Sequence, residues 1–235
     1  MSLRDTRTGA VAQRAAKPKP LVQQAYEEIK ERIISLYFLP GQYLNEAAIC
    51  DALEIGRTPV HQALQRLELE GLVEILPRKG VIIQPDTQAE ILKILESRLT
   101  VEPELVRFAA RRAAAGEITA AEIAELHRLA AEPDADENPP DINAFTTNDR
   151  AFHCYVGDLS DNSVMAEFAR VLHERSTRYW YLNLWQTLDV GRSRDQHMAI
   201  AAAIAAGQCG PAGQAMSDHI GDLQARLSRI QRVAY

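Results

Sequence analysis

Three histidines and one aspartate in the C-terminal half of the chain are candidates for a metal site. Asp149 and His153 are four residues apart, so a helix would place both side chains on one face. His197 precedes an apolar run, and His219 stands beside Ile220. A buried imidazole or carboxylate is costly without a partner, and one divalent ion would satisfy all four side chains if they met in a core. Nitrogen and oxygen donors suit zinc, nickel or manganese. The alternative is four unconnected side chains, because an Asp/His pair at this spacing is more often a surface or structural pair.

A long helical region would have to bring these side chains together. No strand pattern follows Asp86, and the helical periodicity is interrupted by loops rich in glycine, proline, aspartate and asparagine. The pattern predicts helices over residues 87–115, 119–131, 141–159, 163–186, 190–206 and 211–232. We expect an all-α bundle, with Pro103 kinking or splitting its first helix. His127 and His173 lack such partners and are interpreted as structural or exposed.

The most informative stretch of the N-terminal part is residues 56–72. Thr58 is expected to cap the start of a helix, Pro59 to occupy its first position, and Gly71 to follow its end. Apolar residues recur on one face at the spacing of a buried helix. The other face gathers polar residues near the N-terminus, which is the end that a recognition helix inserts into the major groove.

The flanking segments predict a winged helix-turn-helix. Helices are expected over residues 21–36 and 46–53, the second capped by Asn45, and a hairpin over residues 73–84 with Arg78 and Lys79 at its tip. The hairpin would be the wing. We place a disordered basic arm at residues 1–20, the winged helix-turn-helix at 21–85 and the helical bundle at 86–235. The fold class is therefore mainly α.

Charge and composition favour an intracellular protein with modest affinity for DNA. The net charge is −6, and residues 1–20 hold five basic side chains and one acidic one, whereas residues 21–85 hold six basic and nine acidic. DNA affinity should therefore be modest and sensitive to salt. The three cysteines are scattered, with no CxxC pair. No signal peptide or membrane span is evident, so we expect a cytoplasmic protein.

The stretch from residue 57 to 73 resembles the second DNA-binding helix of GntR-type bacterial transcription regulators. The resemblance rests on Arg57-Thr58-Pro59-Val60, Ala63-Leu64, Arg66-Leu67 and Glu70-Gly71-Leu72-Val73, and it extends back to Pro40-Gly41 and forward to Gly80. Gly56 stands where the family usually has serine, and His61-Gln62 where it usually has Arg-Glu, which puts a standard operator sequence in doubt. The DNA contacts we predict are Arg57, Thr58, His61, Gln62, Gln65, Arg78, Lys79 and Gly80.

A second resemblance covers the bundle. Asp149-x-x-Phe152-His153, then His197 before Ala199-Ile200, then His219-Ile220 are similar to the effector domain (FCD domain) of the FadR-type branch of this family, and six helices suggest its VanR-like subgroup. There the matching aspartate and three histidines bind a metal in the pocket that receives small ligands. The resemblance implies a divalent ion on Asp149, His153, His197 and His219, with zinc preferred over nickel or manganese. Gln196 stands where the family usually has glutamate. Arg98 and Arg150 are the predicted effector contacts, although Arg98 and Glu102, four residues apart, also fit a simple ion pair.

These patterns predict a ligand-responsive DNA-binding regulator and not an enzyme. It would bind a palindromic operator as a homodimer and sense a small carboxylate metabolite; repression is the assumed mode, although the sequence does not distinguish a repressor from an activator. Two alternatives stay open. A His₃Asp metal could activate water in an enzyme, for which Glu102 and Glu174 are the nearby general bases. The chain could also bind DNA without any effector.

Overall fold

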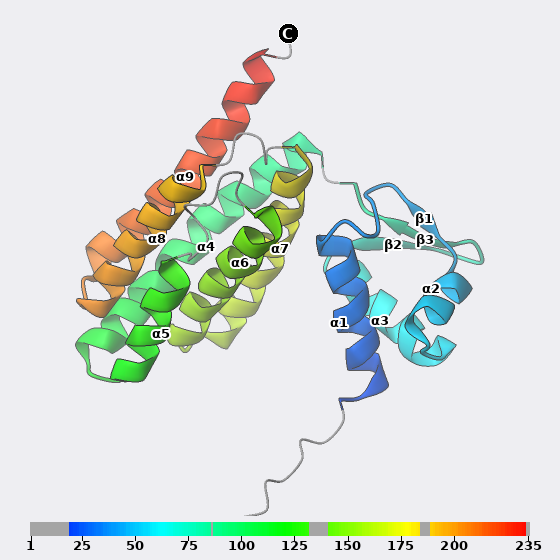
Figure 1. The fold of residues 1–235 in the computed structure, drawn as a ribbon, viewed down its shortest axis with the longest axis horizontal. Coiled ribbons are helices and arrows are strands. Elements are labelled where there is room, and N and C mark those ends of the chain that lie inside the picture. The colour runs from blue at the N-terminus through cyan, green and yellow to red at the C-terminus, as the bar shows by residue number, and fades with distance from the viewer. Residues whose placement is uncertain (1–18, 86, 132–140, 184–188, 234–235) are drawn as a thin grey trace, which may run out of the picture.

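The structure is a computed structural model, and it describes residues 19–85, 87–131, 141–183 and 189–233. Figure 1 shows two parts, which we name the N-terminal unit (residues 19–85) and the helical bundle (residues 87–233). The predicted basic arm lies outside the described residues except for Lys19 and Pro20. The division after residue 85 stays a prediction.

The N-terminal unit has the predicted winged helix-turn-helix fold. Its elements are α1 (Leu21–Ile34), β1 (Tyr43–Leu44), α2 (Glu46–Leu53), α3 (Arg57–Leu69), β2 (Val73–Leu76) and β3 (Gly80–Ile83). The strands form an antiparallel sheet in the order β1-β3-β2. Apolar faces of α1, α2, α3 and the sheet enclose one core, which includes Ile29, Ile49, Leu64 and Val81. The unit therefore has a hydrophobic core of its own.

The start of α3 differs from the prediction. The helix begins at Arg57 with Gly56 as its N-cap and no side-chain cap, so Thr58 is the second helical residue and Pro59 the third. Proline is tolerated throughout the first turn, where backbone N–H groups have no partner within the helix, so it did not mark one position. The expected cap of α2 is confirmed, because the Asn45 side chain accepts a hydrogen bond of 2.8 Å from the Ala47 amide. Gly71 also follows the end of α3 as predicted, at φ +72°.

The wing contains a strand that the sequence did not predict. Tyr43 of β1 pairs with Ile82, and Leu44 pairs with Val81. Gly80 has a φ of +149°, and a Cβ atom at this position would lie 2.5 Å from the Leu44 carbonyl oxygen. Glycine at the start of β3 therefore lets β1 approach the wing.

The bundle matches the predicted helices closely. It consists of α4 (Gln88–Ala114), α5 (Ala120–Ala130), α6 (Ile142–Leu159), α7 (Ser163–Asn183), α8 (Val190–Ala205) and α9 (Cys209–Val233). Pro103 does not split α4, which is one helix across this position. Leu95 and Val106 on either side of the proline are fully buried, and their packing offsets the lost backbone hydrogen bond.

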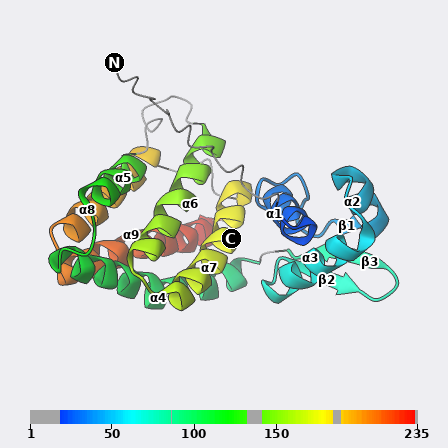
Figure 2. The ribbon, with the colours of Figure 1, turned by 90° about the horizontal axis from the view of Figure 1, so that it is seen from below.

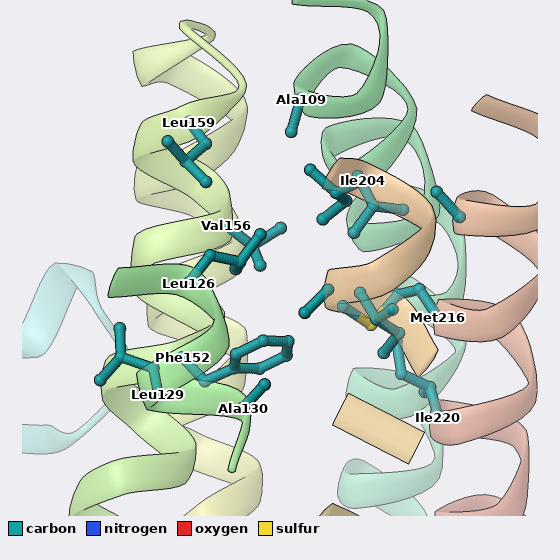
Figure 3. Close-up of a cluster of buried hydrophobic side chains, with 14 of the residues drawn as sticks. Ala109, Leu126, Leu129, Ala130, Phe152, Val156, Leu159, Ile204, Met216 and Ile220 are labelled. Atoms are coloured by element: carbon teal, nitrogen blue, oxygen red, sulfur yellow. The ribbon is translucent and has the colours of Figure 1, made fainter. Parts of the chain in front are cut away.

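The core of the bundle lies between α4 and the helices that surround it. Helix α4 packs against α6, α7, α8 and α9, and Figure 2 shows these helices from below. Figure 3 shows apolar side chains of α5 and α6 facing those of α8 and α9, including Phe152, Ile204 and Ile220. The same helices carry the candidate ligands, so this packing fixes their positions. Among the described residues, no helix is both long and apolar enough to cross a membrane.

Candidate metal centre and DNA-binding face

The four predicted metal ligands come together inside the bundle. Asp149 and His153 on α6, His197 on α8 and His219 on α9 each offer one ligand atom, and these atoms all lie within 4.8 Å of one another. The three histidines are buried, and Asp149 is nearly so. Three imidazole nitrogens and one carboxylate oxygen are a donor set that suits a divalent ion such as zinc.

Glu102 on α4 orients His153. Its Oε2 lies 2.7 Å from His153 Nδ1, and because a carboxylate only accepts hydrogen bonds, Nδ1 carries the proton. Burial alone would raise the pKa of Glu102, but the Arg98 guanidinium and His153 hold it well below its usual range. His153 Nε2 is therefore left as a lone pair, and this buried atom has no hydrogen-bond partner among the described residues. Such a carboxylate–histidine pair is the usual support of a histidine that binds a metal.

Gln196 on α8 gives the same support to His219. Its Oε1 accepts a hydrogen bond of 2.9 Å from His219 Nδ1. Because Nδ1 is the donor, Nε2 is the nitrogen of His219 that can bind a metal. Gln196 is the departure noted in the sequence, and it places a neutral amide where a carboxylate would make the imidazole more basic. His197 Nε2 lies 3.5 Å from Asp149 Oδ1, and its ring stacks on Phe152 with centroids 4.3 Å apart.

His173 is buried beside this centre, so the expectation that it lacks such partners was wrong and the exposed alternative is excluded. It is 2% exposed, and its Nε2 lies 2.9 Å from Asp149 Oδ2. Spacing gave no sign of this contact because His173 lies on α7 and Asp149 on α6. A signal was present in the helix itself, since Ala169, His173 and Ser176 recur on one buried face.

Burial controls the charge of the imidazoles in the protein without metal. It lowers the pKa of His173 and of His197 from 6.5 to about 4, with Arg98 adding to the effect, and it lowers the pKa of His219 well below 6.5. Asp149 has its own pKa lowered, because His173 and the other imidazoles outweigh the effect of burial. At neutral pH His197 and His219 are therefore neutral and Asp149 is ionised, which are the forms that bind metals.

These shifts predict that the metal-free protein loses stability in mild acid. Between pH 6.5 and 4 the imidazoles of His173 and His197 are protonated in the unfolded chain but stay neutral in the folded protein. The free energy of unfolding therefore falls as the pH drops. His173 and His197 each contribute up to about 3 kcal/mol to this fall. Urea unfolding with a chelator present, repeated from pH 7.5 to pH 4.5, measures the effect. A free energy of unfolding that did not change over this range would contradict the prediction.

The two predicted effector contacts have different surroundings. Arg98 is buried, and its guanidinium donates to Glu102 at 2.5 Å and to Ser176 at 2.8 Å. The ion pair that the sequence allowed is therefore present, and its carboxylate, Glu102, also contacts His153. Arg150 is half-buried and faces the N-terminal unit, beside a cavity of about 540 Å³ between α1 and helices α6 and α7. Contact of either arginine with an effector stays a prediction.

The predicted DNA-binding residues lie on accessible surface. On α3 the exposed ones are Arg57, Thr58, His61, Gln62 and Gln65, and at the wing tip Arg78 and Lys79 are exposed while Gly80 is half-buried. His61 Nδ1 lies 3.3 Å from Glu46 Oε2, so it has a neighbour within the N-terminal unit. The N-terminal end of α3 and the wing are thus both open to a duplex, as a winged helix requires.

Comparison with known proteins assigns both parts of the chain. Residues 21–83 match the family model of bacterial regulatory proteins of the gntR family, and residues 93–222 match the FCD domain. The Nta operon transcriptional regulator of Aminobacter aminovorans is 28% identical over 172 residues, which cover 73% of this chain and 78% of that protein. The HTH-type transcriptional repressor GlaR of Escherichia coli is 25% identical over 199 residues, covering 83% and 90%.

Solved structures agree with this assignment. A putative GntR transcriptional regulator from Rhodococcus sp. RHA1 has a TM-score of 0.69 at 25% identity, covering 88% of this chain and 96% of that one. E. coli McbR/YncC shares the fold, with a TM-score of 0.77 at 18% identity over 91% and 100% of the two chains. The two curated relatives are transcription regulators and the Rhodococcus structure is described as one, so we assign this chain as a regulator and not as the metal-dependent enzyme. The chain belongs to the GntR family of bacterial regulators, as a DNA-binding transcription regulator with an FCD effector domain.

Proposed function

We propose that this regulator is a cytoplasmic repressor that binds a palindromic operator as a homodimer and senses a small carboxylate metabolite through a divalent ion. Zinc is the preferred ion, with nickel and manganese as alternatives. The single observation that carries the proposal is the meeting of Asp149, His153, His197 and His219 inside the bundle. Two recognition helices in a dimer would match the two halves of the operator.

Bound by these four residues, a divalent ion that takes more than four ligands would supply positive charge and keep coordination positions open for a carboxylate oxygen. Arg98 lies close to this site, because it pairs with Glu102 and Glu102 contacts the candidate ligand His153. A second anionic group on the metabolite would be drawn to this guanidinium. These features support a small organic acid as the effector.

A buried ion cluster supports coupling between this site and the DNA. Glu174 on α7 forms an ion pair with Lys30 at 2.5 Å, and it accepts hydrogen bonds from Arg150 at 2.7 Å and from Arg170 at 2.8 Å. Lys30 lies on α1 and also donates to Glu70, at the end of α3, at 2.7 Å. We name these five residues the Glu174 cluster. The side chains of Lys30 and Glu174 are 3% and 1% exposed, so water screens their contact very little.

The Glu174 cluster also borders the metal centre in the sequence. Arg150 follows Asp149 directly, and Glu174 follows His173. A shift of α6 or α7 when a ligand binds would therefore move the partners of Lys30 and, through it, the end of the recognition helix. Two packings of this interface that differ in ligand affinity are enough for a population shift, and each would set a different spacing of the two recognition helices in the dimer.

The test is operator binding at controlled metal content. DNA fragments selected from a random pool supply the operator, and fluorescence anisotropy measures its affinity for zinc-loaded and chelator-treated dimer with a panel of small organic acids. We expect one acid class to change the affinity by about tenfold or more in the loaded protein alone. Arg57→Ala should lose operator binding and keep its zinc. An operator affinity that no acid changes in either form would reduce the protein to a DNA binder without an effector.

A further inference from the structure

Asp149 presents its two oxygens to different partners. Oδ1 faces the other candidate ligands, at 3.5 Å from His197 Nε2 and 3.9 Å from His153 Nε2. Oδ2 lies 2.9 Å from Nε2 of His173 on α7. The carboxylate is thus divided between the metal centre and one hydrogen-bond donor.

His173 is built into this position from both sides of its ring. Its Nε2 lies within hydrogen-bond distance of a carboxylate oxygen, which accepts, so Nε2 of His173 is the donor in this contact. Nδ1 lies 3.3 Å from the Thr177 hydroxyl one turn along α7. The ring is 2% exposed and lies 4.5 Å from the His153 ring, centroid to centroid. Both nitrogens have a partner, so the ring is placed to hold Asp149 and not to serve as a fifth ligand.

We propose that His173 is a positioning residue that restricts Asp149 to binding a metal through one oxygen, and thereby sets which ligands the centre accepts. This inference rests on the proposed function. A carboxylate can bind a metal through one oxygen or through both. With Oδ2 held by His173, the four residues supply four donor atoms, and an ion with six positions keeps two for a ligand. If Asp149 used both oxygens, one position would be left.

The consequence is a preference for chelating ligands. A ligand that binds through two oxygens needs two free positions, whereas a ligand that binds through one oxygen needs only one. His173 should therefore raise the affinity for chelating acids and leave the affinity for single-oxygen ligands nearly unchanged. Oxalate and acetate are a matched pair of probes, because both are small carboxylates and only oxalate chelates a metal strongly.

The experiment compares His173→Phe and His173→Gln with the wild-type chain, each loaded with cobalt. Phenylalanine keeps a buried ring and removes the donor, whereas the glutamine amide can still donate to Asp149. We expect the ratio of oxalate to acetate affinity to fall about tenfold in His173→Phe and to be rescued in His173→Gln. The visible spectrum of bound cobalt should change in the phenylalanine variant alone, because it reports the number and type of ligands. Metal content should stay at one ion per chain in all three proteins at saturating cobalt.

Two results would overturn the proposal. One is a His173→Phe variant that does not show the expected change: either its affinity ratio and spectrum stay as in the wild type, or it loses the metal altogether. Neither outcome is a change in how Asp149 binds the metal. The other needs no variant: a crystal structure of the metal-loaded wild type with both oxygens of Asp149 on the ion. If the wild type bound no metal, the proposed function would fail as well. Metal and oxalate binding without any change in operator affinity would count against the proposed function only.

Discussion

Replacing His153 with alanine is expected to weaken zinc binding by about a hundredfold or more, because it removes one of four ligands whose combined binding free energy is on the order of 10 kcal/mol. His153 is the ligand with the most complete support, since Glu102 holds its Nδ1 and Nε2 has no other partner among the described residues. The variant keeps the ion pair of Arg98 and Glu102 within the bundle. The N-terminal unit has a separate core, so it should stay folded and still bind DNA.

A competition titration with a chromophoric chelator measures the zinc affinity, and circular dichroism measures the fold. His127→Ala is the matched control, because His127 is a half-buried histidine on α5 outside the cluster. It should bind zinc as the wild type does. If His153→Ala bound one zinc ion per chain as tightly as the wild type, the metal would be held elsewhere in the protein.

Local sequence signals were sufficient for most of the fold. The breaks at Gly116 and Gly207 ended α4 and α8 where expected, since each glycine adopts positive φ. The Asn45 cap was likewise a local feature. Strand β1 was missed because two residues have no periodicity of their own, and only pairing with β3 makes them a strand. The start of α3 was misplaced because proline fits several positions of a first turn equally well.

The sequence predicted the four candidate ligands, because two of them share one helix and the family resemblance supplied the others. It did not predict the residues that orient them. The pair Asp149 and His153 lies on α6, and its spacing was visible. The partners that orient the ligands lie on other helices, as Glu102 does on α4 and His173 on α7. Gln196 was noticed as a departure from the family, but its hydrogen bond to His219 depends on how α8 packs against α9. Contacts between helices are set by tertiary packing, which one sequence does not reveal.

Glu174→Gln is expected to lower the free energy of unfolding by about 3–5 kcal/mol, because a neutral side chain would leave buried cations without their shared carboxylate. Lys30, Arg150 and Arg170 all form ion pairs with Glu174, and Lys30 is nearly inaccessible to water. Each cation keeps one other carboxylate, which is Glu70 for Lys30, Glu31 for Arg150 and Glu167 for Arg170, but Glu174 is the carboxylate that joins all three. The loss should therefore fall on the contact between α1 and α7, where the two parts of the protein meet.

Glu167→Gln is the matched control for this variant. Glu167 lies on the same helix and pairs with the same Arg170, but its side chain is 57% exposed, so its removal should cost no more than about 1 kcal/mol. Urea unfolding measures both effects, and zinc content should be unchanged in both variants. If the Glu174 cluster carries the coupling, Glu174→Gln will also bind zinc and an effector while its operator affinity no longer responds to the effector. A Glu174→Gln protein as stable as Glu167→Gln, with a full response to the effector, would mean that the signal passes between the two parts by another route.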